Sequence, residues 1–136
     1  MTKHFFKYAL AFAGFALTAV AQAQLSIEIT GAGANRLPIA VADFSGERIV
    51  SQALTSVLRG DLERSGMFRL VDPGAMPLAE TTAVDFANMK TRGADTLVSG
   101  SVTPVAETGE SRYETRFHLH DVLKQTTLGG QSYVST

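Results

Sequence analysis

A strand, helix, strand pattern between residues 37 and 71 is the feature of this sequence that most limits its fold. Residues 37–44 are apolar and include β-branched side chains, residues 49–64 repeat apolar side chains at helical spacing, and residues 67–71 are again short and apolar. Two parallel strands joined by one helix require a right-handed crossover connection. The pattern therefore predicts a βαβ core, in which a mixed sheet carries a helix on its face.

The predicted helix has one apolar side, and the other side is polar. Ser45 or Gly46 is expected as its N-cap, with Glu47 in the first turn, where the helix dipole favours a negative charge. The Ser-Gly pair at 65–66 is expected to end it. Gly60, in mid-helix, is interpreted as a point of close approach by a neighbouring backbone. The apolar stripe consists of Val50, Ala53, Leu54, Val57, Leu58 and Leu62.

The N-terminal region has the three parts of a secretory signal peptide. Lys3 and Lys7 are basic, residues 8–20 form an apolar run too short to span a bilayer comfortably, and residues 21–23 are Ala-Gln-Ala. Residues 1–23 are therefore predicted to be a cleavable signal and the periplasm is the expected location. A retained apolar anchor is the alternative. The sequence has no cysteine, so neither a lipidated N-terminal cysteine nor a disulfide is expected.

Residues 24–136 have the size of one ordinary domain, whose stability must come from a single apolar core. The signal contains two lysines and no carboxylate, so its removal takes the formal charge from −1 to −3. Nucleic-acid binding depends on clustered Lys and Arg. A mildly acidic domain argues against that class of function.

The segment that follows the signal reads as a strand on a hinge. Residues 24–29 alternate apolar and polar side chains, and the glycines at 31 and 33 then loosen the chain. Such a strand can complete its own sheet or pair with a partner. The two glycines lack the third glycine and the following helix of a dinucleotide-binding loop.

The remainder of the sequence predicts one more helix and an antiparallel hairpin. A short helix is expected over residues 84–91 and strands over 96–104 and 112–120, joined by a turn at 107–110. A third antiparallel strand is expected over 128–134, weakened by its two glycines. The predicted class is α/β (α+β), a mixed sheet of about five to six strands with two helices. In the strand 112–120, one face is predicted to hold Tyr113, Thr115, Phe117 and Leu119, and the other Arg112, Glu114, Arg116, His118 and His120.

Few residues suggest chemistry. His118 and His120 share a strand face, but no companion ligands for a metal ion are evident, so they are interpreted as solvated histidines. Asp43 follows the first core strand, where open α/β sheets often bind ligands, and is interpreted as a turn or cap residue. The triplet at 99–101 lacks the spacing of a nucleophile elbow. No enzyme, catalytic residue, metal or cofactor is predicted.

Four stretches carry a resemblance to a known family. They are the Ile-Glu-Ile of residues 27–29, the strand 37–44, the helix end 58–68 and the strand entry 93–102. The Pro-Ile-x-Val, Asp-Leu-x-x-Ser-Gly-x-Phe and Gly-Ala-Asp motifs within them are the most specific. Together they resemble the N-terminal domain of the TolB family of the Tol-Pal envelope system, over nearly the whole of residues 24–136.

The resemblance implies a non-enzymatic protein–protein adaptor of cell-envelope integrity and division. In that family an α/β domain precedes a six-bladed propeller, the propeller holds the lipoprotein Pal, and the N-terminal strand engages TolA. No propeller repeats are present in this sequence, so Pal binding is expected only where a propeller is present. By position, the TolA-contacting residues would be Gln24, Leu25, Ser26, Ile27, Glu28, Ile29, Thr30, Gly31, Ala32, Gly33, Ala34 and Asn35.

Two other functions stay open from the sequence. A TolB-like module could instead regulate cell-wall synthases through its sheet face. A small periplasmic hydrolase or ligand-binding enzyme would need Asp43 or His118 for its activity.

Overall fold

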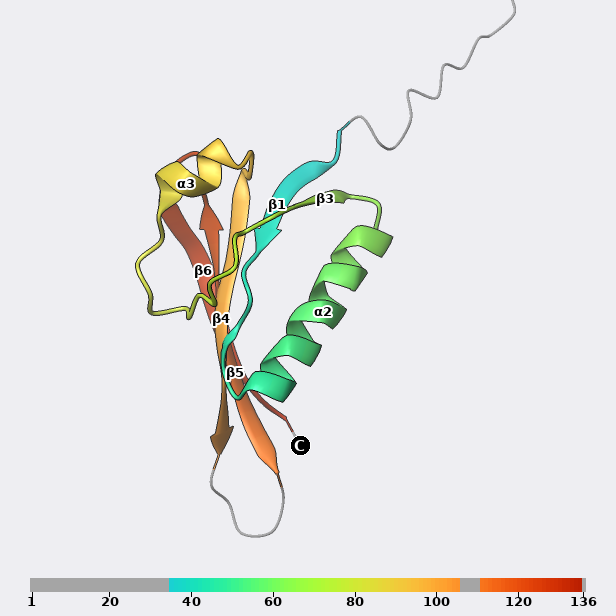
Figure 1. Ribbon diagram of the computed structural model, residues 1–136, viewed down its shortest axis with the longest axis vertical. Coiled ribbons are helices and arrows are strands. Elements are labelled where there is room, and N and C mark those ends of the chain that lie inside the picture. The colour runs from blue at the N-terminus through green and yellow to red at the C-terminus, as the bar shows by residue number, and fades with distance from the viewer. Residues whose placement is uncertain (1–34, 106–110, 136) are drawn as a thin grey trace, which may run out of the picture.

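The computed structural model describes residues 35–105 and 111–135 and shows a six-stranded mixed sheet with two helices (Figure 1). The strands lie in the order β3-β1-β4-β5-β6, and the short β2 pairs with β4. The predicted α+β class is therefore confirmed. The elements are β1 (Leu37–Val41), β2 (Ser45–Gly46), α2 (Arg48–Arg64), β3 (Phe68–Val71), α3 (Phe86–Thr91), β4 (Thr96–Val105), β5 (Arg112–Asp121) and β6 (Thr126–Ser135).

The predicted βαβ core is present. β1 pairs in parallel with β3 and also with β4, which places β1 in the interior of the sheet. β4, β5 and β6 then form two consecutive antiparallel pairs, as the alternating pattern predicts. The turn predicted at 107–110 lies outside the described residues.

Helix α2 covers one face of the sheet (Figure 1). Four residues of the predicted stripe, Val50, Leu54, Leu58 and Leu62, pack against a buried cluster of Ile39, Val41, Phe44, Val98 and Val102. Ala53 and Val57 are exposed, so that part of the prediction is wrong. Ser51 and Thr55 occupy the buried positions instead. Their hydroxyls tolerate burial because each donates to a helix carbonyl, Ser51 to Arg48 and Thr55 to Ser51.

The N-cap of α2 differs from the prediction. Glu47 is the cap, and its carboxylate accepts a hydrogen bond of 2.8 Å from the backbone N–H of Val50. Ser45 and Gly46 form β2 instead. Gly46 has a φ of +103°, and a Cβ there would lie 2.0 Å from the carbonyl oxygen of Val102, so only glycine allows this contact.

The other two predictions for the helix have opposite outcomes. The helix ends at Ser65, and Gly66 has a φ of +71°, so the predicted stop is confirmed. At Gly60 an added Cβ would meet only the Arg64 side chain, at 3.8 Å. The close backbone neighbour predicted at Gly60 is therefore not found.

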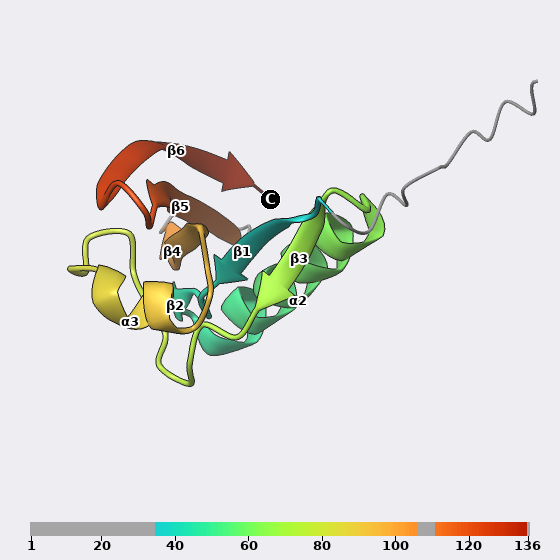
Figure 2. The same cartoon turned by 90° about the horizontal axis from the view of Figure 1, so that it is seen from above.

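The second sheet face is covered by α3 and by residues 72–85, called here the β3–α3 connection. α3 and α2 lie on opposite sides of the sheet, and a view from above shows α3 beside β4 (Figure 2). Leu78 ties the connection to the sheet, because its N–H donates to the carbonyl of Asp43 and its carbonyl accepts from the N–H of Gly100, both at 2.9 Å. The core on this side consists of Ala40, Ala42, Val71, Met89, Ala94, Leu97 and Val122.

Candidate functional site

The segment predicted to contact a partner is only partly visible. Residues 24–34 lie outside the described residues, and Asn35 is an exposed turn residue. Two residues later, Leu37 begins β1 with 54% of its surface exposed. Leu37 is also one wall of an apolar groove, so the predicted segment joins the described fold at the edge of that groove.

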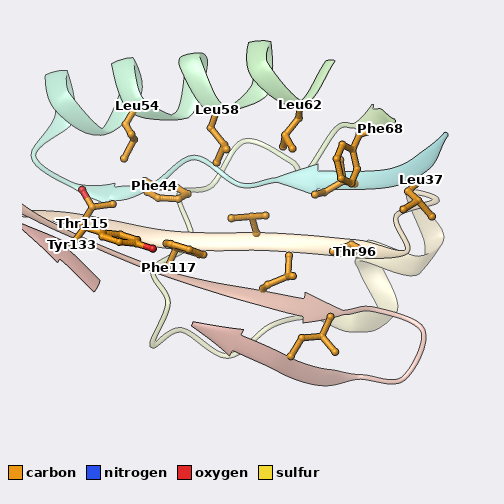
Figure 3. A pocket seen from close by; sticks show the side chains of 14 residues that line it. Leu37, Phe44, Leu54, Leu58, Leu62, Phe68, Thr96, Thr115, Phe117 and Tyr133 are labelled. Atoms are coloured by element: carbon orange, nitrogen blue, oxygen red, sulfur yellow. The ribbon is translucent and has the colours of Figure 1, made fainter. Parts of the chain in front are cut away.

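The groove lies between α2 and the sheet and has a volume of about 540 Å³. Leu54, Leu58 and Leu62 point from α2 toward the sheet, and Phe117 and Tyr133 lie on the sheet side of the groove below Phe44 (Figure 3). The groove exists because α2 packs over β1 and its neighbours, while β5 and β6 carry apolar side chains on the same face beyond the helix. Leu119 and Leu128 extend this apolar lining, and Thr96 and Thr115 supply two of its few polar groups.

An aromatic pair forms part of the groove wall. The rings of Phe117 and Tyr133 are stacked with centroids 6.3 Å apart and an interplanar angle of 14°. Phe117 and Leu119 lie on the face predicted from the alternation of residues 112–120, so that prediction is confirmed. The lining is mainly apolar and can bury apolar surface.

The side chain of Asp43 forms an ion pair with Arg59, whereas the sequence interpretation made Asp43 a turn or cap residue. Its Oδ1 lies 2.9 Å from Nη2 of Arg59, and the two side chains are 41% and 33% exposed respectively. The Arg59 guanidinium also donates from Nε and Nη2 to the carbonyl of Val41, at 3.1 and 2.5 Å. Asp43 and Arg59 thus fasten α2 to the end of β1.

Both strand histidines were interpreted as solvated; this is wrong for His120, which is buried, and His118 is partly buried. His120 is 3% exposed, with Nε2 at 2.9 Å from the Ser99 hydroxyl and Nδ1 at 3.0 Å from the Thr127 hydroxyl. His118 is partly buried and its Nδ1 lies 2.9 Å from the carbonyl oxygen of Glu80. The alternation of the strand placed both rings correctly on one face, but their cover comes from the β3–α3 connection, from α3 and from β6, which the strand pattern does not reveal.

Ser99 and His120 resemble only part of a catalytic triad, because the third group is the hydroxyl of Thr127 and not a carboxylate. Ser99 is 0% exposed, so no substrate can reach its hydroxyl in this arrangement. Burial, and after it the charge of His118, lower the pKa of His120 from 6.5. A buried neutral imidazole between two hydroxyls is a structural unit of the core.

Asp43 and His118 belong to separate groups, one with Arg59 and the other with Glu80. Within residues 35–105 and 111–135, no three His, Asp or Glu side chains gather as they would around a metal ion. In the same part of the chain, no helix has both the length and the apolar character needed to cross a membrane.

Comparison with known sequences places this domain among envelope proteins. The family described as the TolB amino-terminal domain matches residues 25–128. The Tol-Pal system protein TolB of Dechloromonas aromatica is 48% identical over 119 residues, which are 88% of this chain and 27% of that protein. Its counterpart in Aromatoleum aromaticum is 50% identical over 127 residues, or 93% and 29% of the two lengths. The chain therefore spans just over a quarter of the length of these relatives.

Solved structures share the fold. TolB from Acinetobacter baumannii superposes with a TM-score of 0.56 at 23% identity, over 71% of this chain and 22% of that one. The LpoB C-terminal domain from Salmonella enterica superposes with a TM-score of 0.55 at 15% identity, over 74% and 82%. At these identities the likeness concerns the fold alone. The match over residues 25–128, together with the confirmed βαβ core, shows that this chain belongs to the TolB amino-terminal domain family of Tol-Pal system proteins.

Proposed function

We propose that this domain is a non-enzymatic interaction module of the Tol-Pal system that engages TolA through the segment 24–35. The single observation that carries the proposal is the family match, which begins at residue 25 and so includes nearly all of that segment. The proposal also assigns residues 1–23 to a cleaved signal, residues 24–136 to one domain, and the domain to the periplasm.

The fold supports this assignment in two ways. The segment joins β1 next to an apolar groove, so a partner held by the segment would lie beside a surface able to bury apolar side chains. The described residues also bring no nucleophile and base together at an accessible position. Contribution to an interface, rather than chemistry, is the function that this arrangement fits.

Binding of the purified protein to TolA tests the proposal. Deletion of residues 24–35 is expected to abolish binding, and Ile27→Asp is expected to weaken it at least about tenfold because it places a charge on the apolar side of the alternating segment. Ser26→Asp, on the opposite side, is the matched control and should bind nearly as the parent does. Undiminished affinity after the deletion would show that the interface lies elsewhere.

The alternative roles make different predictions. If the segment merely completes the domain's own sheet, its deletion should lower stability, and Ile27→Asp in a protein that stays folded should leave TolA binding unchanged. If the domain regulates cell-wall synthases, pull-down from envelope extracts should recover a synthase and not TolA. Pal binding is proposed only for a protein that also carries the propeller.

A further inference from the structure

The second face of the sheet carries a polar cluster that joins three parts of the chain distant in sequence. His120 of β5 contacts Ser99 of β4 and Thr127 of β6 through its two ring nitrogens. His118, two residues earlier, contacts the carbonyl of Glu80 in the β3–α3 connection. The two rings lie edge to face, with centroids 5.9 Å apart. Two ionisable rings thus lie at the meeting point of β4, β6 and the connection.

The fit of His118 is specific. A Cβ at Gly130 would lie 2.0 Å from Cδ2 of His118, so the ring occupies the space that a side chain on β6 would fill. A carbonyl oxygen only accepts hydrogen bonds, so Nδ1 of His118 carries a hydrogen and donates it to Glu80. The Glu80 carboxylate also accepts a hydrogen bond of 2.5 Å from the Ser101 hydroxyl. Glu80 is therefore held to the sheet both by its backbone carbonyl and by its side chain.

We propose that His118 and His120 form an acid-sensitive latch, which holds β6 and the β3–α3 connection on the sheet while His120 is neutral and releases the first half of β6 when the His120 ring becomes charged. The penalty at low pH is not a lost hydrogen bond, because the hydroxyls of Ser99 and Thr127 can accept from either ring nitrogen. It is the cost of a buried cation beside a second cation.

The released part is set by the packing. All ten residues of β6 are exposed, and among the described strands β6 pairs only with β5, so lifting it is the least costly way to hydrate His120. The ladder between β5 and β6 is also interrupted there, by a register shift between Leu119 and His120. The groups that face the two rings are Arg116 from β5, Glu80 from the connection, Ser99 from β4, Thr127 from β6 and the ring of Phe86 from α3.

The direction of the effect follows from proton linkage. Burial, and after it His118, lower the pKa of His120 below the 6.5 of an exposed ring. The free-energy difference that favours the closed form over the open form is therefore full above pH 6.5. It decreases as the pH falls from 6.5 toward the lowered pKa of His120. Each pH unit between the two pKa values favours opening by about tenfold.

Hydrogen exchange followed by mass spectrometry tests the latch, with labelling times scaled to the intrinsic exchange rate at about pH 7.5 and about pH 5. Peptides covering residues 126–130 should lose protection at the lower pH, while those from the middle of β4 keep theirs. His120→Gln should abolish the difference between the two pH values. His118→Gln should reduce it, because His120 then charges without a cationic neighbour.

Thr127→Val is the matched control, since it removes a latch partner and leaves both titrating rings. It should raise exchange at both pH values and preserve the difference between them. Equal acid-induced exchange in the parent and His120→Gln would overturn the proposal, as would simultaneous exposure of β4 and β6. A proton NMR titration of the protein without the proposed signal 1–23, which contains His4, leaves two imidazoles and should show one ring titrating below pH 6.5.

Discussion

The hydroxyl of Thr55, inside α2, accepts a hydrogen bond of 3.2 Å from the backbone N–H of Phe44. The same hydroxyl donates to the carbonyl of Ser51 at 2.8 Å. Phe44 follows β1 and precedes β2, so its N–H has left the sheet ladder and needs a partner from the helix. A polar residue in the buried face of α2 is therefore what allows the chain to pass from β1 to β2 under the helix.

Thr55→Val should destabilise the protein by about 1–3 kcal/mol, because it keeps the side-chain shape and leaves the buried N–H of Phe44 unsatisfied. Chemical denaturation measures the change. Ser56→Ala, at the adjacent exposed position, is the control and should change the unfolding free energy by less than about 0.5 kcal/mol. Equal effects of the two substitutions would mean that the Thr55 hydroxyl has no special role.

Sequence reasoning recovered the elements whose signal is periodic and local. The βαβ core, the hairpin strands and the alternation at residues 112–120 follow from patterns of 3.6 and 2 residues, which hydrophobic burial imposes directly. The N-cap and the interior of α2 were predicted less well. Ser45 has a good capping side chain, yet in the structure it belongs to β2, which pairs with β4. Thr55 is buried because its hydroxyl accepts the hydrogen bond of the Phe44 N–H, 11 residues earlier in the chain.

The candidate site shows the same division. The exposure of His118 and His120 could not be predicted from β5 alone, because their cover comes from Glu80 and Thr127 in other segments. The groove likewise depends on how far α2 extends over the sheet. Such features are set by tertiary packing, for which a single sequence carries no periodic signal.

Gly100→Ala should be strongly destabilising. An added Cβ at Gly100 would lie 2.5 Å from the Phe44 ring and 2.6 Å from the carbonyl oxygen of Arg116, so both the groove wall and the β4–β5 ladder would have to move. We expect a loss of about 1–3 kcal/mol, measured by thermal or chemical unfolding.

Gly129→Ala is the matched control for Gly100→Ala, since Gly129 is also a strand glycine and an added Cβ there meets nothing within 4 Å. It should be neutral or stabilising by up to about 1 kcal/mol, through the lower entropy of the unfolded chain. If both substitutions cost the same, strand propensity and not the contact with Phe44 explains the requirement for glycine at position 100.

Arg59→Met should destabilise the protein more than Asp43→Asn. Arg59 donates to the carbonyl of Val41 as well as pairing with Asp43, so loss of the guanidinium removes both contacts. Because the ion pair is partly exposed, its own contribution is expected to be at most about 1 kcal/mol and to weaken in high salt. The measurement is the unfolding free energy of each variant at low and high salt, and a larger loss for Asp43→Asn would refute this ranking.

Ser132→Ala should raise the pKa of Glu114, which links β5 to β6. The carboxylate of Glu114 accepts from the Ser132 hydroxyl at 2.7 Å and from Arg116 at 3.0 Å, and these bonds, that of Ser132 first, lower its pKa from 4.5. A lowered carboxyl pKa stabilises the fold above pH 4.5, and this contribution is lost as the pH falls through the lowered value. The parent and Ser132→Ala should therefore differ in stability at neutral pH and converge in acid.

Carboxyl carbon NMR can follow the titration of Glu114 directly, with Ser111→Ala as an exposed serine control that should leave it unchanged. The pH range in which Glu114 changes the stability lies below 4.5, whereas the stabilisation that depends on neutral His120 declines from pH 6.5 downward. The two effects on β6 can thus be separated within one pH series. A Glu114 titration that is identical in the parent and in Ser132→Ala would show that the serine hydroxyl does not hold this carboxylate in solution.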